Sequence, residues 1–234
     1  MRVVVTGGSS GIGAALVHQL LEDGHEVVSI DRRPHDSIIN EHLHQPEMVL
    51  ADLSDIDQLS HAAEIVSRGE VDVLINNAGI YNGKPLDEYD MEEFTKLFLT
   101  NVMAVGRLSS LLIPRLRESL GRIINITSVV AYVGGLDTPY TASKAAVLNL
   151  TQNLARQLGP YGITVNAVAP GIVRGTDVFD KIPDNVRERI LAQSVTKRFV
   201  QQEEVVKTVM WLAFEAPQSI VGHCLEINGG SHMH

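Results

Sequence analysis

Several residue types and patterns are scarce in this sequence, and each scarcity excludes a class of function. A single cysteine, Cys224, has no partner for an internal disulfide or a thiolate metal cluster, and its apolar surroundings predict a small buried residue. No apolar run approaches the roughly 20 residues of a membrane helix. The segment Arg2–Thr6 is typical of a strand rather than of a signal peptide, so we expect a cytoplasmic protein without membrane attachment.

Positive charge is scarce as well. The chain has 19 Lys and Arg residues against 28 Asp and Glu residues, which gives a formal net charge of −9 at pH 7. Because nucleic-acid phosphates and anionic lipids bind to basic faces, we expect neither as a partner. Nine histidines are present, but His35, His42, His44 and His61 lack the spacing of zinc ligands, so no metal site is expected.

What the sequence does contain is a regular alternation of strand-like and helix-like segments. With 234 residues, 44% of them hydrophobic, the chain is long enough for one α/β domain spanning residues 1–234. Most of the strand-like runs are apolar at consecutive positions, as in strands that are covered on both faces of a parallel sheet. These runs are Val3–Thr6, Glu26–Asp31, Met48–Asp52, Asp72–Asn76, Arg122–Thr127, Gly162–Ala169 and Cys224–Asn228.

The segments between these runs place apolar residues three and four positions apart, as in Leu16, Leu20 and Leu21, which indicates helices. The alternation predicts a Rossmann-type, doubly wound parallel sheet of about seven strands with helices on both faces. Residues 34–46 are polar and rich in histidine, and they are interpreted as a loop or irregular helix. Residues 172–200 suit a substrate-binding lid, although an ordinary connecting helix stays open as an alternative.

A glycine-rich turn follows the first strand and precedes the first helix. Glycines allow a tight turn in which backbone N–H groups approach a pyrophosphate, and the start of the helix adds unpaired donors and partial positive charge. The spacing differs from the common G-x-G-x-x-G form, and a tight turn without a ligand is the alternative. The residues expected to bind the dinucleotide here are Gly7, Ser9, Ser10, Gly11, Ile12 and Gly13.

Asp31 ends the second strand, where a carboxylate accepts hydrogen bonds from the hydroxyls of the adenosine ribose. The same carboxylate would repel a 2′-phosphate, so the expected cofactor is NAD, with NADP less favoured. Arg32 and Arg33 weaken this argument because either side chain is able to reach a 2′-phosphate.

Taken in order, these motifs and several later ones resemble the short-chain dehydrogenase/reductase family, in its single-domain branch of about 250 residues. The resemblance covers nearly the whole chain. It rests on Thr6-Gly-x-x-x-Gly11-x-Gly13, Ala51-Asp52-Leu53, Asn76-Asn77-Ala78-Gly79, Ser128, Tyr140-x-x-x-Lys144, Pro170-Gly171 and Asn228-Gly229-Gly230. The Ser128–Tyr140 spacing is one residue shorter than is usual in the family. Ser10 stands where NADP users often carry a basic residue, and this also favours NAD.

The resemblance implies roles for individual residues. Tyr140 and Lys144 would be catalytic, with Lys144 also binding the nicotinamide ribose, and Ser128 would stabilise the charge that develops on the reacting oxygen. Asn101 would hold a proton-relaying water. Asp52 and Leu53 would lie near the adenine, and Thr176 would bind the carboxamide after a one-residue shift. The remaining cofactor contacts would come from Asn77, Ala78, Gly79, Pro170, Gly171, Ile172 and Val173.

The Tyr-x-x-x-Lys motif can also be argued from chemistry. Thr138 is expected to cap a helix that has Pro139 at its first position, so that Tyr140 lies in the first turn and Lys144 on the same face. A nearby ammonium and the helix N-terminus should lower the pKa of the tyrosine from about 10 toward the working pH. Such a tyrosine exchanges a proton with an alcohol or carbonyl oxygen. An exposed Tyr/Lys pair is the alternative for the motif in isolation.

The predicted function is therefore an NAD-dependent oxidoreductase that transfers hydride between the cofactor and a secondary alcohol/ketone substrate. A non-catalytic NAD(P)(H)-binding sensor or scaffold of the same fold is the alternative, but it would have no need for Tyr140, Lys144 and Ser128 together. Apolar residues in 130–137 and 172–200 favour small ketones, acyl chains or ring alcohols over sugars. The long helices expected around residues 90–119 and 139–159 resemble those that pair in the family's homodimers and homotetramers.

Overall fold

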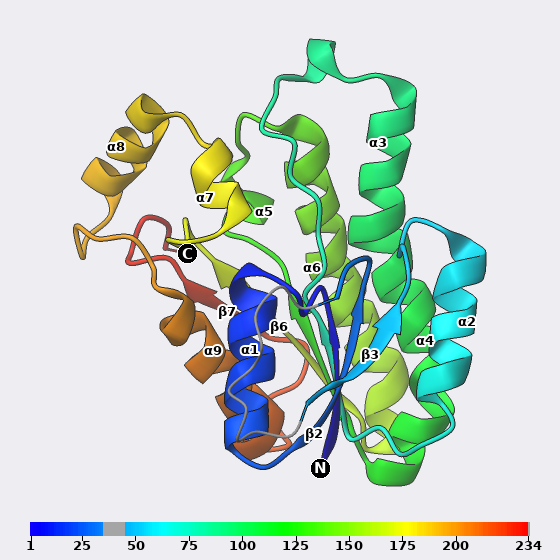
Figure 1. Ribbon diagram of the computed structural model, residues 1–234. Helices are drawn as coiled ribbons and strands as arrows, with labels where there is room; N and C mark the ends of the chain where they lie inside the picture. Colours follow the sequence, from blue (N-terminus) through cyan, green and yellow to red (C-terminus); the bar gives the residue numbers. More distant parts are fainter. Residues whose placement is uncertain (35–44, 234) are drawn as a thin grey trace.

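The computed structural model describes residues 1–34 and 45–233, and in this part of the chain a seven-stranded parallel sheet forms the centre of the molecule (Figure 1). The order of the strands is β3-β2-β1-β4-β5-β6-β7. The strands are β1 (Arg2–Thr6), β2 (Glu26–Asp31), β3 (Glu47–Leu50), β4 (Val73–Asn76), β5 (Arg122–Ile126), β6 (Thr164–Pro170) and β7 (Cys224–Ile227). The predicted fold class is confirmed, and the seven expected strands differ from the observed ones only at their ends.

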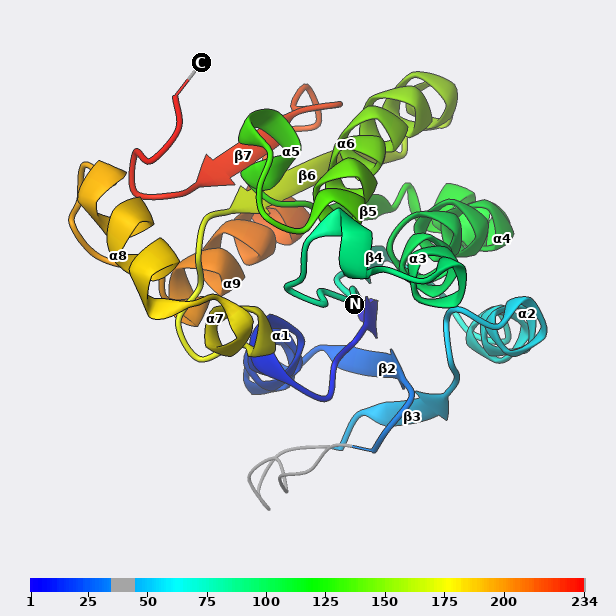
Figure 2. The ribbon, with the colours of Figure 1, turned by 90° about the horizontal axis from the view of Figure 1, so that it is seen from above.

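Helices cover both faces of the sheet, as Figure 2 shows from above. The α-helices are α1 (Gly11–Glu22), α2 (Ile56–Val66), α3 (Met91–Phe98), α4 (Ala104–Ser119), α5 (Val130–Val133), α6 (Thr138–Leu158), α7 (Asp177–Lys181), α8 (Asp184–Gln193) and α9 (Gln202–Met210). Short 3₁₀ turns occupy η1 (Leu86–Glu88) and η3 (Gly159–Tyr161), and π-helical turns occupy η2 (Leu99–Met103) and η4 (Trp211–Glu215).

Two apolar cores lie on opposite faces of the sheet, because successive side chains of a strand point to opposite faces. In β1, Val4 packs with α2, α4 and α6 on one face, while Val3 and Val5 pack with α1, α9 and η4 on the other. All three valines are fully buried. This explains the uninterrupted apolar runs in the sequence, since a strand covered on both faces has no side that needs to be polar.

The helical run Met91–Ser119, which comprises α3, η2 and α4, is long and apolar enough by composition to cross a membrane. In this fold it is a core helix, because Leu97, Leu108, Leu112 and Leu116 on its inner face are buried against the sheet and its neighbours. An apolar stripe of this kind is what a helix needs in order to pack onto a sheet.

Two expectations need comment. Cys224 is partly exposed rather than buried, because it lies on the outermost strand β7, whose residues are all of intermediate exposure. The loop or irregular helix expected for residues 34–46, with His35, His42 and His44, falls largely outside the described residues.

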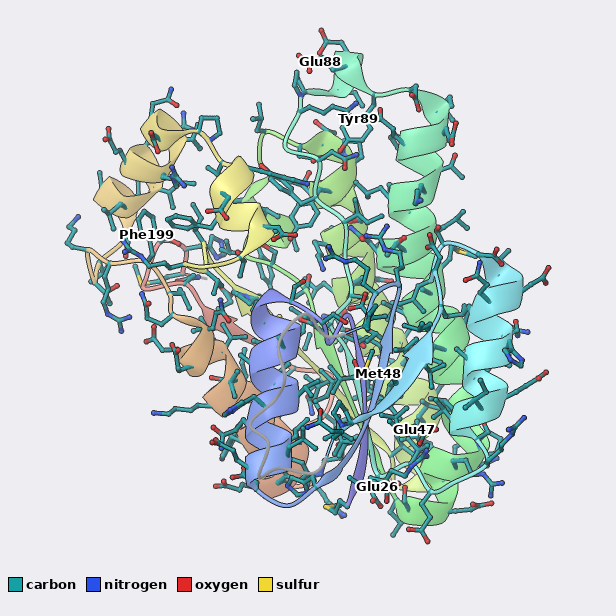
Figure 3. All side chains as sticks on the ribbon, in the orientation of Figure 1. Glu26, Glu47, Met48, Glu88, Tyr89 and Phe199 are labelled. Atoms are coloured by element: carbon teal, nitrogen blue, oxygen red, sulfur yellow. The ribbon has the colours of Figure 1, made fainter. Side chains whose placement is uncertain are left out.

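The amino-terminal edge of the sheet is held together by one buried cation. The guanidinium of Arg2 lies 2.9 Å from Glu26 on β2 and 2.9 Å from Glu47 on β3, and it donates to the carbonyl oxygens of Val66 and Glu70. Its side chain is only 9% exposed. Glu26 and Glu47 lie at the opposite end of the molecule from Tyr89 (Figure 3), so this network is remote from the carboxyl edge of the sheet.

We predict that Arg2→Met lowers the free energy of unfolding by about 3 kcal/mol, because the buried carbonyl oxygens lose their donor and two carboxylates lose their partner. Urea unfolding followed by circular dichroism measures the change. Arg156→Met on the exposed surface of α6 is the matched control. Equal stability losses in the two variants would contradict a structural role for the Arg2 network.

Candidate active site

The glycine-rich turn between β1 and α1 has the backbone conformation that glycine allows. Gly7 and Gly11 have φ angles of 68° and 52°, in the left-handed region, and the N–H of Gly7 donates to Ile30 at 2.8 Å. Ser10 occupies the N-cap of α1 without a side-chain capping bond, and the first turn of the helix has no acidic residue. The start of α1 therefore keeps backbone donors and partial positive charge that suit a phosphate group.

A set of hydrogen bonds ties this turn to the end of β4. The hydroxyl oxygen of Thr6 accepts from the backbone N–H groups of Asn77 and Ala78, each at 3.0 Å. The Asn77 amide donates in return to the carbonyl oxygens of Thr6 and Gly7, at 3.0 and 3.1 Å. Gly13 completes the contact, since a Cβ atom there would lie 1.9 Å from the Gly7 oxygen. The shape of the turn therefore depends on Asn77 and Gly13.

Two carboxylates at the ends of neighbouring strands line the same side of the cavity. Asp31 accepts from the N–H groups of Ser9, Arg32 and Arg33, at 3.0, 2.6 and 3.3 Å, so it is fixed beside the glycine turn. Burial works to raise the pKa of Asp52, but hydrogen bonds from Ser54, together with the charges of Lys96 and Arg32, bring it below its ordinary value. The lowered pKa of Asp52 favours its carboxylate form at neutral pH.

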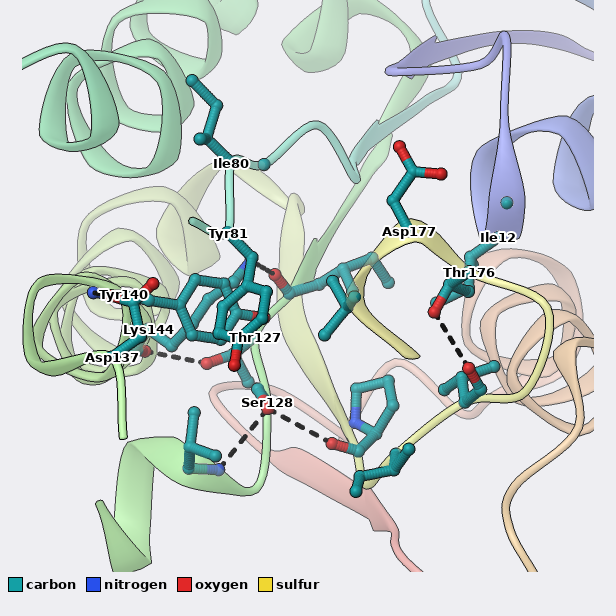
Figure 4. Close-up of a pocket in the computed structure, with 18 of the residues that line it drawn as sticks. Ile12, Ile80, Tyr81, Thr127, Ser128, Asp137, Tyr140, Lys144, Thr176 and Asp177 are labelled. Atoms are coloured by element: carbon teal, nitrogen blue, oxygen red, sulfur yellow. Dashed lines mark hydrogen bonds between the residues drawn. The ribbon is translucent and has the colours of Figure 1, made fainter. Parts of the chain in front are cut away.

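The tyrosine, serine and lysine of the predicted catalytic set meet on the wall of one cavity of about 900 Å³, which also reaches the glycine turn (Figure 4). The Ser128 hydroxyl, at the end of β5, is close enough to the Tyr140 phenol to lower its pKa, and it lies 3.4 Å from the Pro170 carbonyl oxygen. The ammonium of Lys144 lies 5.6 Å from the centre of the Tyr140 ring and donates to the Ile126 carbonyl oxygen at 2.9 Å. The two ends of this cavity thus suit a dinucleotide and a reacting oxygen.

Burial, rather than the charge of the lysine, dominates the ionisation of this pair. Desolvation raises the pKa of Tyr140; the hydrogen bond with Ser128 opposes the rise, and Tyr81 and Asp137 add to it. The expected lowering by Lys144 is therefore wrong for the protein alone. Desolvation also lowers the pKa of Lys144 to about 8. Both shifts have the same cause, since a low-dielectric site disfavours phenolate and ammonium alike.

Asn101 lies in the π-helical turn η2 and is buried, with 1% exposure. Its Oδ1 accepts from the Ile80 N–H at 2.7 Å, and its Nδ2 donates to the Ile80 oxygen and to the Ser143 hydroxyl, each at 3.0 Å. The side chain thus joins the segment after β4 to α6. A π-helical turn inside a longer helix is often found at a functional site. The water-holding role stays a prediction.

The start of α6 differs from the expectation. The N-cap is Asp137, whose carboxylate accepts from the Tyr140 N–H at 3.0 Å, and not Thr138, which is the first helical residue. Thr176 caps α7 and donates to Val173 at 2.9 Å. A Cβ atom on Gly11 would lie 3.5 Å from the Thr176 methyl group, so Thr176 faces the glycine turn.

Most of the residues predicted for the site line this cavity, and three do not. Ser9 is engaged with Asp31 and Arg33, Gly13 packs on Gly7, and Asn101 lies behind the wall. The predicted residues that line it are Gly7, Ser10, Gly11, Ile12, Asp31, Arg32, Asp52, Leu53, Asn77, Ala78, Gly79, Ser128, Tyr140, Lys144, Pro170, Gly171, Ile172 and Val173.

Several residues that line the cavity were not named from the sequence. Ile80 and Tyr81 after β4 and His232 near the carboxyl end lie outside every segment that was expected to form the site. Asp137 before α6 and Val186 and Ile190 on α8 lie within the expected ranges 130–137 and 172–200 but were not singled out. No motif marks these residues, because they reach the cavity through tertiary packing. Only Tyr81 could have been suggested from the sequence, by its closeness to the Asn-Ala-Gly segment. In residues 1–34 and 45–233, no group of three His, Cys, Asp or Glu side chains is arranged to hold a metal ion.

The fold and the cavity together define the class: a Rossmann-type protein with a dinucleotide-shaped site beside a Ser-Tyr-Lys set, in which the serine and the lysine are buried. Residues 1–187 match the family model described as short chain dehydrogenase. The chain belongs to the short-chain dehydrogenase/reductase family of NAD(P)-dependent oxidoreductases.

Curated relatives and solved structures match over nearly the full length. The chain is 35% identical over 240 residues to the 3-oxoacyl-(acyl-carrier-protein) reductase FabG of Staphylococcus aureus, covering 98% of this chain and 97% of the relative. It is 32% identical to the enzyme of that name from Thermotoga maritima, covering 97% and 96%. A proposed NAD(P)-dependent gluconate 5-dehydrogenase from Beutenbergia cavernae, with NADP bound at low occupancy, superimposes with a TM-score of 0.90 at 32% identity, covering 98% and 96%.

We predict that Gly13→Ala abolishes or greatly weakens dinucleotide binding, because the added methyl group has to displace the Gly7 carbonyl from the turn. Titration of the protein with NADH and NADPH, followed by nucleotide fluorescence, measures the affinity. Gly159→Ala serves as the control, since that glycine has a helical φ and open space around its Cβ position. Unchanged affinity in Gly13→Ala would refute the close packing of this turn.

Proposed function

We propose that the protein is an NAD(H)-preferring oxidoreductase that interconverts a secondary alcohol and a ketone. The observation that carries this proposal is the Ser128–Tyr140 hydroxyl pair on the wall of the same cavity that extends to the glycine turn. A protein that only senses the dinucleotide has no use for two neighbouring hydroxyls and a buried ammonium beside the nicotinamide end of its site.

The dinucleotide would be held along the carboxyl edge of the sheet. The glycine turn and the start of α1 would bind the pyrophosphate, Asp31 the adenosine ribose, and the Asp52–Leu53 segment the adenine. Lys144 would bind the other ribose, with Pro170–Val173 beside the nicotinamide. The nicotinamide, when bound, supplies the hydride chemistry.

Tyr140 would transfer the proton to or from the substrate oxygen. Its raised pKa keeps the phenol protonated at neutral pH, which is the form that protonates a carbonyl oxygen. Ser128 would donate a hydrogen bond to the same oxygen and stabilise its developing negative charge. Lys144 carries a proton below pH of about 8, so at neutral pH it adds positive charge to the site and orients ribose hydroxyls.

The substrate end of the cavity is largely apolar. Its walls come from α5, the following loop and α8, with Val130, Val133, Leu136, Val186 and Ile190 among the lining residues. This supports a small ketone, an acyl chain or a ring alcohol as substrate. We assign the role of a lid to residues 172–200, because Val173 and Val200 pair at its base and α7 and α8 both line the cavity. A cytoplasmic homodimer or homotetramer completes the proposal.

We predict that Tyr140→Phe lowers kcat at least a thousandfold, because the ring is kept while the proton-transferring hydroxyl is lost. NADH binding should be unchanged. Nicotinamide absorbance with a panel of ketones and alcohols measures turnover, and nucleotide fluorescence measures binding. Tyr161→Phe on the exposed turn η3 is the matched control. Retained turnover in Tyr140→Phe would reject the proton-transfer role and favour a binding function.

We predict that Asp31→Ser raises the NADP(H)/NAD(H) ratio of kcat/KM at least tenfold. The substitution removes the carboxylate that accepts ribose hydroxyls and repels a 2′-phosphate, and it leaves Arg32 and Arg33 in the cavity. Steady-state kinetics with both cofactors and one substrate gives the ratio. Asp57→Ser on the exposed face of α2 should leave it unchanged. An unchanged ratio in Asp31→Ser would mean that Asp31 does not select the cofactor.

A further inference from the structure

One buried carboxylate outside the predicted catalytic set joins three parts of the site. Asp137 is 1% exposed, and both of its oxygens are used. Oδ1 accepts from the Tyr140 N–H at 3.0 Å, while Oδ2 accepts from the N–H groups of Asn82 and Gly83 at 3.1 and 2.9 Å. The Tyr89 hydroxyl donates to the carboxylate at 2.8 Å. A helix cap alone needs one oxygen and one or two donors, so this carboxylate does more than begin α6.

The groups that donate to the second oxygen come from the segment of residues 80–89, which crosses the start of α6. This segment presents Tyr81 to the cavity, and the Tyr81 ring packs edge-on against the Tyr140 ring with centroids 5.0 Å apart (Figure 4). On its other side the segment contacts the lid, because the Lys181 ammonium of α7 donates to the Tyr81 carbonyl oxygen at 2.8 Å. Asp137 therefore holds Tyr81 between the proposed proton donor and the lid.

Tyr89 strengthens this connection from the far end of the segment (Figure 3). Its ring lies under the Lys84 ammonium at 4.9 Å and beside Phe94 of α3. Its hydroxyl therefore reaches Asp137 from a packed ring rather than from a freely rotating side chain. A donor held in place loses little conformational entropy when it makes its hydrogen bond.

We propose that Asp137 is a positioning residue that clamps residues 80–89 onto the start of α6 and so fixes Tyr81 against Tyr140, over the reacting end of the cavity. The inference rests on the proposed function, since it assigns Asp137 a part in orienting the tyrosine that transfers the proton. Asp137 itself touches neither substrate nor cofactor in this scheme; it acts through the Tyr140 backbone and the Tyr81 ring.

The clamp has an electrostatic consequence. The titratable groups that face Tyr140 are Tyr81 from the clamped segment, Asp137 at the N-cap of α6 and Lys144 within α6. Lys181 of α7 lies next to Tyr81. The negative charge of Asp137 disfavours the phenolate and raises the pKa of Tyr140. A neutral residue at position 137 should therefore lower that pKa. Alcohol oxidation needs the phenolate, so the rise of its rate with pH should move to lower pH.

Asp137→Asn separates the clamp from the helix cap. If Oδ1 of the asparagine still accepts from the Tyr140 N–H, its amide nitrogen is turned toward the N–H groups of Asn82 and Gly83. All of these groups are hydrogen-bond donors, so the clamp bonds are lost while the cap bond is kept. Asp55→Asn is the matched control, because Asp55 caps α2 through Asp57 and Gln58, away from the cavity. Tyr89→Phe is a second variant that removes one donor and keeps the ring.

The first measurement is amide hydrogen exchange in the ligand-free protein, which requires no enzymatic activity. Asp137→Asn should speed exchange at Asn82 and Gly83, Tyr89→Phe should do so to a lesser degree, and Asp55→Asn should not. Unchanged exchange at these amides in both clamp variants would overturn the clamp, whether or not the wild type shows turnover. The absence of NAD(P)(H)-dependent turnover in the wild type would instead overturn the proposed function.

The second measurement is steady-state kinetics against pH. Asp137→Asn should lower kcat roughly tenfold to a hundredfold, as expected for misplaced reacting groups, and leave the KM for NADH unchanged. Its pH profile for oxidation should move to lower pH, which a loss of folded protein alone does not cause. Tyr89→Phe should lower kcat a few-fold. It tests the same clamp if Asp137→Asn fails to fold. Faster exchange with unchanged kcat and an unchanged pH profile would overturn the positioning role.

Discussion

The site depends first on the tie between the ends of β1 and β4. These strands are neighbours in the sheet although the chain leaves β1 toward β2 on the other side, so a crevice opens between their carboxyl ends. The mutual hydrogen bonds of Thr6 and Asn77 fix the width of this crevice, and Gly13 lets α1 approach the turn. The groups proposed to bind the pyrophosphate take their position from this tie, because the turn, the start of α1 and the Asn-Ala-Gly segment all depend on it.

A second constraint is the burial of the groups that would carry the chemistry. Desolvation raises the pKa of Tyr140 and lowers the pKa of Lys144, and both shifts favour the neutral form of the side chain. Each group then needs local partners that the fold supplies: Ser128 for the phenol and the Ile126 carbonyl for the ammonium. The backbone carbonyl also turns the lysine toward the sheet, where a ribose would lie. The positions of these side chains are therefore set by β5 and α6 together rather than by the helix alone.

The order of strands and helices along the chain and the fold class could be predicted from the sequence because both follow from local patterns. Apolar runs mark buried strands, and the glycine turn and Tyr140-x-x-x-Lys144 lie at fixed places within this fold. The cap of α6 could not be assigned in the same way, since Asp137 and Thr138 are both good capping residues and only the tertiary partners of Asp137 distinguish them. Tyr81 could not be predicted for a similar reason, since it belongs to a segment that is hydrogen-bonded to Asp137, a residue far from it in the sequence. The sequence also does not reveal how strongly Tyr140 is desolvated, so the direction of its pKa shift could not be predicted.

The cavity has one part formed by residues that sequence motifs mark and another formed by residues that only tertiary packing brings together. The matching relatives include 3-oxoacyl-(acyl-carrier-protein) reductases and a proposed gluconate 5-dehydrogenase, whose named substrates have little in common beyond an oxygen-bearing carbon. A common fold therefore does not select the substrate. Under the proposed function, the selection in this chain would fall to the walls that no motif describes: residues 130–137, the proposed lid, and the segment hydrogen-bonded to Asp137. That segment contacts both the proposed lid, through Lys181, and Tyr140, through the Tyr81 ring. Under the proposed function, a substrate that displaces either wall would therefore also shift the hydroxyl proposed to transfer the proton, and substrate choice would be coupled to the geometry of catalysis.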